Sequence, residues 1–208
     1  MAGARFASLR PRKVGERRPR GWIVHRGQGY GTSVSGAPLE VFLPPGDPIS
    51  SLILAGYHGD EPETTTVLST ALRTFAPERL RCAVTLAANP DGLARGTRAN
   101  ARGVDLNRNF PTTNWSPNPV LHCWFDDEPK SVELSPGSEP ASEPETRFLL
   151  ALVSSLAPRA IISLHSRLGC VDDPGETGLG RWLSRETGLQ LVKDIGYLTL
   201  GSFGTWAQ

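Results

Sequence analysis

The stretch LILAGYHGDEPE, from Leu52 to Glu63, joins an apolar run to a histidine and two acids. Short runs of large apolar residues are typical of strands that are buried on both faces of a sheet. The run therefore predicts a buried strand over residues 51–55, with His58, Asp60 and Glu61 placed directly after its end. These residues fit a helix cap with an acidic first turn, and they also fit one half of a metal site.

Comparable apolar runs recur along the chain, and helical patterns lie between them. The further strands are expected at residues 39–43, 82–88, 160–164 and 189–192, and the helices at residues 62–75, 143–156 and 178–187. Strands that alternate with helices predict a single α/β domain with a mixed, largely parallel sheet flanked by helices. Residues 111–142 are rich in Pro, Ser, Asn and Glu, and we expect them to form a long irregular excursion.

Composition narrows the function classes. A net charge of +1 gives no reason to expect a nucleic-acid partner, and no apolar run reaches the roughly 20 residues that span a bilayer. Residues 1–20 hold seven Arg and Lys against Glu16 alone, so we expect a disordered basic arm followed by a folded domain over 21–208. The N-terminus lacks a secretory signal pattern, and the three cysteines fit free thiols, so a cytoplasmic location is expected.

Two histidines are expected at one edge of the sheet. His58 follows the strand at 51–55 and His165 follows the strand at 160–164, and ligands gather outside the carboxyl ends of parallel strands. Glu61 lies three residues after His58, where a turn leads into a helix. Two imidazoles and a carboxylate can hold Zn²⁺ with a fourth position open for water. The spacing alone is a weak signal, and a capping or core role stays open.

Residues 89–110 read NPDGLARGTRANARGVDLNRNF and follow the predicted strand at 82–88. Asn-Pro-Asp-Gly is a turn signal, and four arginines come after it. A guanidinium offers a rigid fork of donors that matches a carboxylate. A solvated loop would explain the charges, but it explains poorly why DLNRN is placed between Val104 and Phe110. A binding loop for an acidic substrate explains this better.

The ordered motifs HGDE, NPDG, RGVDLNRNF and SLHS resemble the zinc metallocarboxypeptidases. Within that family, GVDLNRNFP, PGSEPET and GSFGTW resemble the bacterial murein peptide amidases, and the similarity extends over roughly residues 38–208. The resemblance implies one Zn²⁺ per chain, held by His58, Glu61 and His165. It also implies a small murein tripeptide as substrate, cut at the γ-D-glutamyl–meso-diaminopimelate amide bond during cytoplasmic peptidoglycan recycling.

The resemblance assigns further roles. Asp105 would orient a zinc histidine. Asn107 and Arg108 would grip the free carboxylate of the residue that is released, and Arg95 would stabilise the tetrahedral oxyanion. Tyr197 would cover the substrate, although its alignment needs a one-residue gap and core packing is an equal alternative.

Two acids after the second histidine could contribute to substrate specificity. Asp172 and Asp173 could face the second amino acid centre of diaminopimelate, or could simply form a turn before Pro174.

The resemblance also implies a general-base glutamate on a late strand beyond GSFGTW. The sequence ends at Gln208 and its last acid is Asp194, so we expect a fragment or truncated chain whose last strand and helix are missing. The alternative is that another carboxylate substitutes for the glutamate. Two other functions stay open: a zinc deacylase of the aspartoacylase type, and a zinc- and peptide-binding fragment without turnover. The sequence does not fix the oligomeric state.

Overall fold

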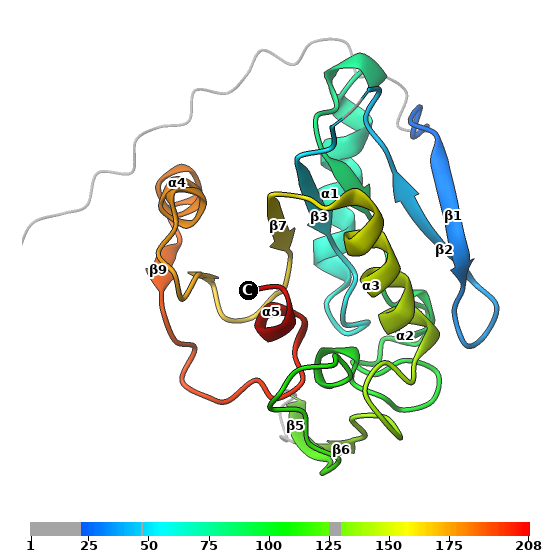
Figure 1. The fold of residues 1–208 in the computed structure, drawn as a ribbon, viewed down its shortest axis with the longest axis vertical. Helices are drawn as coiled ribbons and strands as arrows, with labels where there is room; N and C mark the ends of the chain where they lie inside the picture. The colour runs from blue at the N-terminus through cyan, green and yellow to red at the C-terminus, as the bar shows by residue number, and fades with distance from the viewer. Residues whose placement is uncertain (1–21, 47, 125–129) are drawn as a thin grey trace, which may run out of the picture.

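The computed structural model describes residues 22–46, 48–124 and 130–208, so the basic arm predicted over 1–20 lies outside the described residues (Figure 1). The strands are β1 (Gly27–Thr32), β2 (Pro38–Phe42), β3 (Ser51–Leu54), β4 (Ala83–Thr85), β5 (Val120–Trp124), β6 (Lys130–Leu134), β7 (Ala160–Ser163), β8 (Cys170–Asp172) and β9 (Gln190–Val192). The α-helices are α1 (Pro62–Thr74), α2 (Pro90–Arg95), α3 (Pro144–Leu156), α4 (Gly178–Thr187) and α5 (Phe203–Trp206). Two short 3₁₀ turns are η1 (Pro77–Arg79) and η2 (Leu106–Arg108).

The main sheet has five strands in the order β1-β2-β4-β3-β7. Strand β3 runs parallel to both β4 and β7, and Ile53 pairs with Val84 on one side and with Ile162 on the other. Strand β2 runs antiparallel to β4 and to β1. The predicted mixed α/β sheet is therefore confirmed, and its parallel centre is the part that carries the histidines.

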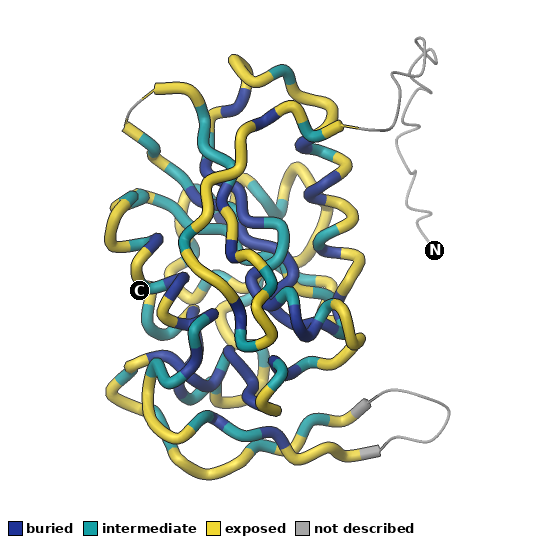
Figure 2. Tube along the Cα trace, turned by 90° about the vertical axis from the view of Figure 1, so that its right-hand side faces the viewer, coloured by how far each residue is buried: buried dark blue, intermediate teal, exposed yellow. Residues whose placement is uncertain are grey.

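Alternation along β3 explains how two helix layers cover the sheet. Leu52 and Leu54 belong to a core cluster that includes Leu149 and Leu152 of α3. Ile53 packs with the opposite cluster, which contains Leu68 and Leu72 of α1. Because successive side chains of a strand point to opposite faces, one apolar run serves both layers. Figure 1 shows α1 and α3 on opposite sides of β3, and Figure 2 shows the buried residues gathered in the middle of the molecule.

The three predicted helices are confirmed, but two expectations about strands were wrong. Residues 111–142 are not wholly irregular, because β5 and β6 form an antiparallel hairpin within them. The strand predicted at 189–192 exists as β9, but it pairs with β8 in a separate two-stranded sheet (Figure 1). Within the described residues, no strand pairs with the outer edge of β7. No helix of the described chain combines the length and apolar character that crossing a bilayer requires.

The segment before and within α5 packs onto the DLNRNF loop. The Phe110 amide donates to the carbonyl of Gly201 at 2.9 Å, and the Phe203 amide donates to Oδ1 of Asn107 at 3.0 Å. The rings of Phe110 and Phe203 meet edge-on with centroids 5.2 Å apart. These contacts fix the backbone of the loop that carries Asn107 and Arg108, which were predicted to bind substrate.

The HGDE and NPDG motifs touch each other through two glycines. A β-carbon at Gly59 would lie 1.9 Å from the carbonyl carbon of Gly92, so no larger residue fits there without moving the backbone. Asn89 caps α2 by accepting the Gly92 amide at 2.9 Å, which holds Gly92 in place. The turn that presents His58 therefore rests directly on the first turn of α2.

We predict that Gly59→Ala destabilises the fold because the added methyl group collides with backbone atoms rather than with a flexible side chain. Overpacking of this kind costs about 1–3 kcal/mol, measurable as a lower free energy of unfolding in urea. Gly29→Ala is the matched control, since nothing lies within 4 Å of a β-carbon at that position. Equal stability of the two variants would contradict the proposed glycine contact.

Candidate metal centre

Two parallel strands bring the predicted histidines to one edge of the sheet. Leu54 of β3 pairs with Ser163 of β7, and His58 and His165 follow these strand ends. Glu61 occupies the N-cap position of α1, but its side chain makes no capping hydrogen bond. The carboxylate turns instead toward the two imidazoles, so the interpretation of Glu61 as a simple helix cap does not describe this residue.

The ligand atoms of His58, Glu61 and His165 converge on one point. Nδ1 of His58 lies 3.2 Å from Oε1 of Glu61, and Nδ1 of His165 lies 3.2 Å from Oε2 of the same carboxylate. The two Nδ1 atoms are 3.2 Å apart, and the three ligand atoms all lie within 4.8 Å of one another. Each of the three groups offers an electron pair toward the same point, which suits a bound cation better than hydrogen bonds among the three groups. Two imidazoles with a carboxylate are a ligand set that suits Zn²⁺.

The protonation states of Glu61 and His165 favour metal binding. Burial raises the pKa of Glu61, but hydrogen bonds with His165 and His58 outweigh it and hold the pKa well below its usual range, so the carboxylate is ionised. Burial lowers the pKa of His165, which keeps that imidazole neutral with a lone pair to offer. About a third of the His165 side chain (34%) reaches solvent, so the cluster is open on that side.

Asp105 supports the cluster from beneath. Its Oδ1 lies 3.5 Å from Nε2 of His58 and accepts the Asn107 amide at 2.9 Å, while its Oδ2 accepts Nε of Arg98 at 2.9 Å. Burial opposes ionisation of Asp105, but the charge of Arg98 and the nearby His58 imidazole hold its pKa well below the ordinary value. A carboxylate at Nε2 favours the tautomer whose Nδ1 lone pair faces the metal position. This contact fits the orienting role predicted for Asp105, which stays a prediction.

Comparisons with known proteins agree with this geometry. Residues 50–170 match the family model described as zinc carboxypeptidase. The murein peptide amidase A of Escherichia coli strain K12 is 47% identical over 85% of this chain and 74% of that protein. The Vibrio campbellii murein peptide amidase A is 44% identical over 85% of this chain and 72% of that protein.

Solved structures give the same result. The crystal structure of a murein-tripeptide amidase from Escherichia coli O157 superposes with a TM-score of 0.86 at 45% identity, covering 91% of this chain and 82% of that one. Bovine thrombin-activatable fibrinolysis inhibitor, at 17% identity over 88% of this chain and 74% of that one, shares the fold with a TM-score of 0.63. The chain belongs to the zinc carboxypeptidase family.

The loop expected to bind a carboxylate in this carboxypeptidase holds a buried arginine. Arg108 is 9% exposed, and its Nη1 donates to the carbonyl of Asn107 at 2.6 Å. In the described part of the chain, no acid forms an ion pair with Arg108. Oδ1 of Asn107 accepts the Phe203 amide, so the Nδ2 donors of the carboxamide remain for a ligand. Binding of a carboxylate by Asn107 and Arg108 stays a prediction.

Arg95 lies away from the three ligands. It is exposed, and its guanidinium donates to the carbonyl of Ala101 and to Oγ of Ser35, each at 3.4 Å. Arg98 reaches the cluster instead, with Nη1 3.9 Å from Oε1 of Glu61. The resemblance assigned the oxyanion role to Arg95 and gave Arg98 no role, but the geometry brings Arg98 rather than Arg95 to the three candidate ligands.

The remaining predicted residues lie farther along the chain. Tyr197 is 53% exposed, so the core-packing alternative does not describe it, and its role as a substrate cover stays a prediction. Oδ2 of Asp173 accepts both the amide and the hydroxyl of Thr177 at 2.7 Å, so this acid forms a turn at the start of α4. Asp172 ends β8, where burial and the nearby charges of Asp173 and Asp194 raise its pKa.

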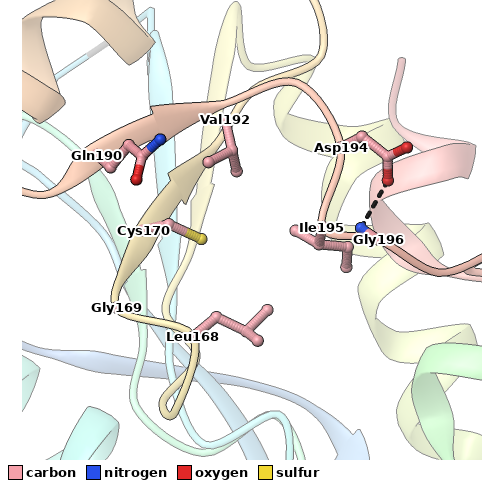
Figure 3. Close-up of a pocket in the computed structure, with 8 residues that line it drawn as sticks. All are labelled: Leu168, Gly169, Cys170, Gln190, Val192, Asp194, Ile195 and Gly196. Carbon is pink, nitrogen blue, oxygen red and sulfur yellow. Dashed lines mark hydrogen bonds between the residues drawn. The ribbon is translucent and has the colours of Figure 1, made fainter.

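A hollow of about 360 Å³ opens after the second ligand histidine. Figure 3 shows it between the turn at Leu168 and Gly169, strands β8 and β9, and the following segment, where the carboxylate of Asp194 accepts the Gly196 amide at 2.7 Å. Its lining residues are Leu168, Gly169, Cys170, Gln190, Val192, Asp194, Ile195 and Gly196. The sequence offered no signal for this hollow, because its walls come from two elements that pair only in the tertiary structure.

Sequence reasoning also missed a polar cluster next to Glu61. Oδ2 of Asp60 lies 3.1 Å from Nε2 of His122 on β5 and 3.2 Å from Nη2 of Arg167. His122 lies in the segment expected to be irregular, so its position could not be predicted from the sequence. The cluster ties the β5–β6 hairpin to the loop after His165.

We predict that Glu61→Gln lowers zinc affinity by at least about 100-fold, because the amide keeps the shape of the side chain but removes the charged ligand. Competition with a chromophoric zinc chelator measures the affinity. Glu63→Gln is the matched control, since Glu63 is an exposed acid in the same first turn of α1. Equal zinc affinity in the two variants would exclude Glu61 as a ligand.

Proposed function

We propose that this chain hydrolyses the γ-D-glutamyl–meso-diaminopimelate amide bond of murein peptides and releases diaminopimelate. The observation that carries the proposal is the convergence of His58, Glu61 and His165 beside Arg108, a buried cation without an acidic partner in the described residues. Zinc carboxypeptidases are hydrolytic, and the similar proteins named murein peptide amidase A favour this substrate over the small acyl amino acids of an aspartoacylase-type enzyme.

The three ligands define what the metal position can do. Zn²⁺ held there would act as a Lewis acid toward the scissile carbonyl and would make a bound water more acidic. His58 presents its Nδ1 because Asp105 stands at its other nitrogen. His165 leaves the site open on its exposed side, which is where a peptide bond can approach.

The departing residue is held by the DLNRNF loop in this proposal. Diaminopimelate carries a free carboxylate at its α-carbon, and the rigid fork of Arg108 can bind that group bidentately. Burial makes such a charge-assisted pair stronger than it would be in water. The Asn107 carboxamide can add a donor on the same side, since its oxygen is fixed by the Phe203 amide.

We assign stabilisation of the developing oxyanion to Arg98. It stands between Asp105 and Glu61, and its guanidinium stays charged because burial is outweighed by the neighbouring carboxylates, which raise its pKa. A fixed donor in a water-poor site stabilises charge that appears in the transition state without reorganisation. Arg95 has no such position.

A second candidate function, binding of zinc and peptide without turnover, is favoured by one observation. Among the described residues, the carboxylates that contact the ligand histidines are those of Glu61 and Asp105. Glu61 belongs to the ligand set and Asp105 is engaged with Arg98. Neither is free to take a proton from water during hydrolysis.

The proposed setting is the cytoplasm, with a small recycled murein peptide as the substrate. The three cysteines Cys82, Cys123 and Cys170 are free thiols, which fits a reducing compartment. This location remains a proposal about the cell rather than a property of the fold.

The proposal is tested by incubating L-Ala-γ-D-Glu-meso-diaminopimelate with the zinc-loaded chain and measuring released diaminopimelate, with zinc content determined on the same sample. We expect release that a chelator abolishes and added zinc restores. Bound zinc without release would establish the second candidate function. Release of acid from N-acyl amino acids, but not from the tripeptide, would instead identify a deacylase.

We predict that Arg98→Lys lowers kcat for this substrate by about 100-fold with a small change in KM, because the guanidinium contact is needed in the transition state. Arg95→Lys is the control and should change kcat by less than about threefold. A larger loss of kcat in Arg95→Lys than in Arg98→Lys would return the oxyanion role to Arg95.

A further inference from the structure

We propose that the pocket between residues 95–103 and the β5–β6 hairpin binds the free α-carboxylate of the γ-linked D-glutamate, and that Arg95 is the residue that reads it. The inference rests on the proposed function, because it names how the same site recognises the acyl side of its substrate. It concerns the side of the scissile bond opposite to Arg108.

The pocket lies next to the metal centre. It has a volume of about 390 Å³ and is lined by Arg95, Thr97, Arg98, Ala99, Asn100, Ala101, Gly103, His122, Val132, Glu133 and Leu134. Two of these residues also reach the centre: Arg98 lies 3.9 Å from Glu61, and His122 contacts Asp60. A peptide whose scissile bond lies at the ligands can therefore extend one residue into this pocket.

The pocket contains an arginine with unused donors. Arg98 is engaged by Asp105 at 2.9 Å, but Arg95 makes only two long hydrogen bonds, each of 3.4 Å. No ion pair of Arg95 occurs within the part of the chain that the structure describes. A guanidinium has five N–H donors, so most of those of Arg95 are available to a ligand. The one acid of the lining, Glu133, is exposed on β6.

The chemistry of the substrate supplies a matching anion. In a γ-glutamyl amide the scissile carbonyl belongs to the glutamate side chain, so the main-chain carboxylate stays free. Four carbon–carbon bonds separate the two groups, which places the carboxylate at most about 5 Å from the reacting carbonyl. An α-linked peptide with a neutral residue at this position carries no anion at this distance. The substrate thus has a carboxylate on each side of its bond, and the site has Arg108 and Arg95, both without acidic partners in the described residues.

The test compares two tripeptides that differ in one group: L-Ala-γ-D-Glu-meso-diaminopimelate, and the same peptide with the glutamate α-carboxylate converted to a carboxamide. We expect the parent chain to favour the carboxylate peptide by about tenfold in kcat/KM, mainly through KM. Arg95→Gln should lose this preference while its kcat changes little. Arg102→Gln is the matched control, because it removes a charge from the same loop at a residue that pairs with Glu143 outside the pocket lining.

Calorimetry with the dipeptides L-Ala-D-Glu and L-Ala-D-isoglutamine separates this inference from the proposed hydrolysis. If the chain binds L-Ala-D-Glu more tightly than L-Ala-D-isoglutamine and Arg95→Gln abolishes this preference, the inference is supported even when no tripeptide is cleaved. In that case only the proposed hydrolysis is wrong. Cleavage of both tripeptides at equal rates overturns the inference and leaves the proposed function standing. Loss of the preference in Arg102→Gln as well as in Arg95→Gln also overturns it, since net charge would explain the effect. If the tripeptide is not cleaved and the acidic dipeptide is not bound, the inference and the proposed function are both overturned.

Discussion

The buried carboxylate of Asp105 is the interaction on which the site depends. One oxygen faces His58 and caps the turn that begins DLNRNF, and the other holds Arg98. A buried carboxylate is costly unless it is paired and hydrogen-bonded, and here every partner is itself a site residue. A single charge therefore positions His58, Arg98 beside Glu61, and the loop that carries Asn107 and Arg108.

The parallel centre of the sheet provides the platform for that charge. Strands β3 and β7 end side by side, so the turns that follow them must share one edge. Gly59 then brings the first turn against Gly92, which is possible only because Gly59 has no β-carbon. Tyr57 is fully buried between this edge and Phe203, with its ring 5.4 Å from that of His58 and 5.6 Å from that of His165. Apolar packing thus limits how far the two histidine rings can move.

The arginines of the 89–110 segment divide into two kinds. Arg98 and Arg102 are paired with acids of the chain and serve its architecture as well as its site. Arg95 and Arg108 form no ion pair within the described residues, one at an exposed pocket and the other almost fully buried. Since guanidinium groups match carboxylates, the unpaired members are the ones with capacity for an acidic substrate. This arrangement suits a ligand that carries one anionic group on each side of the bond to be cleaved.

The sequence by itself determined the elements with strong local signals: the apolar runs, the three long helices and the histidines at strand ends. It also placed Asp105, Asn107 and Arg108 in one loop, because motif order and spacing are local properties. It assigned the oxyanion role to Arg95 and overlooked Arg98, since a three-residue separation along one loop leaves the direction of each side chain open. Nor could it place β9 beside β8 rather than in the main sheet, or find His122 on a hairpin whose strands have weak patterns. Those outcomes were decided by tertiary structure, because they depend on which distant backbone segments pair and on which buried charge each arginine can reach.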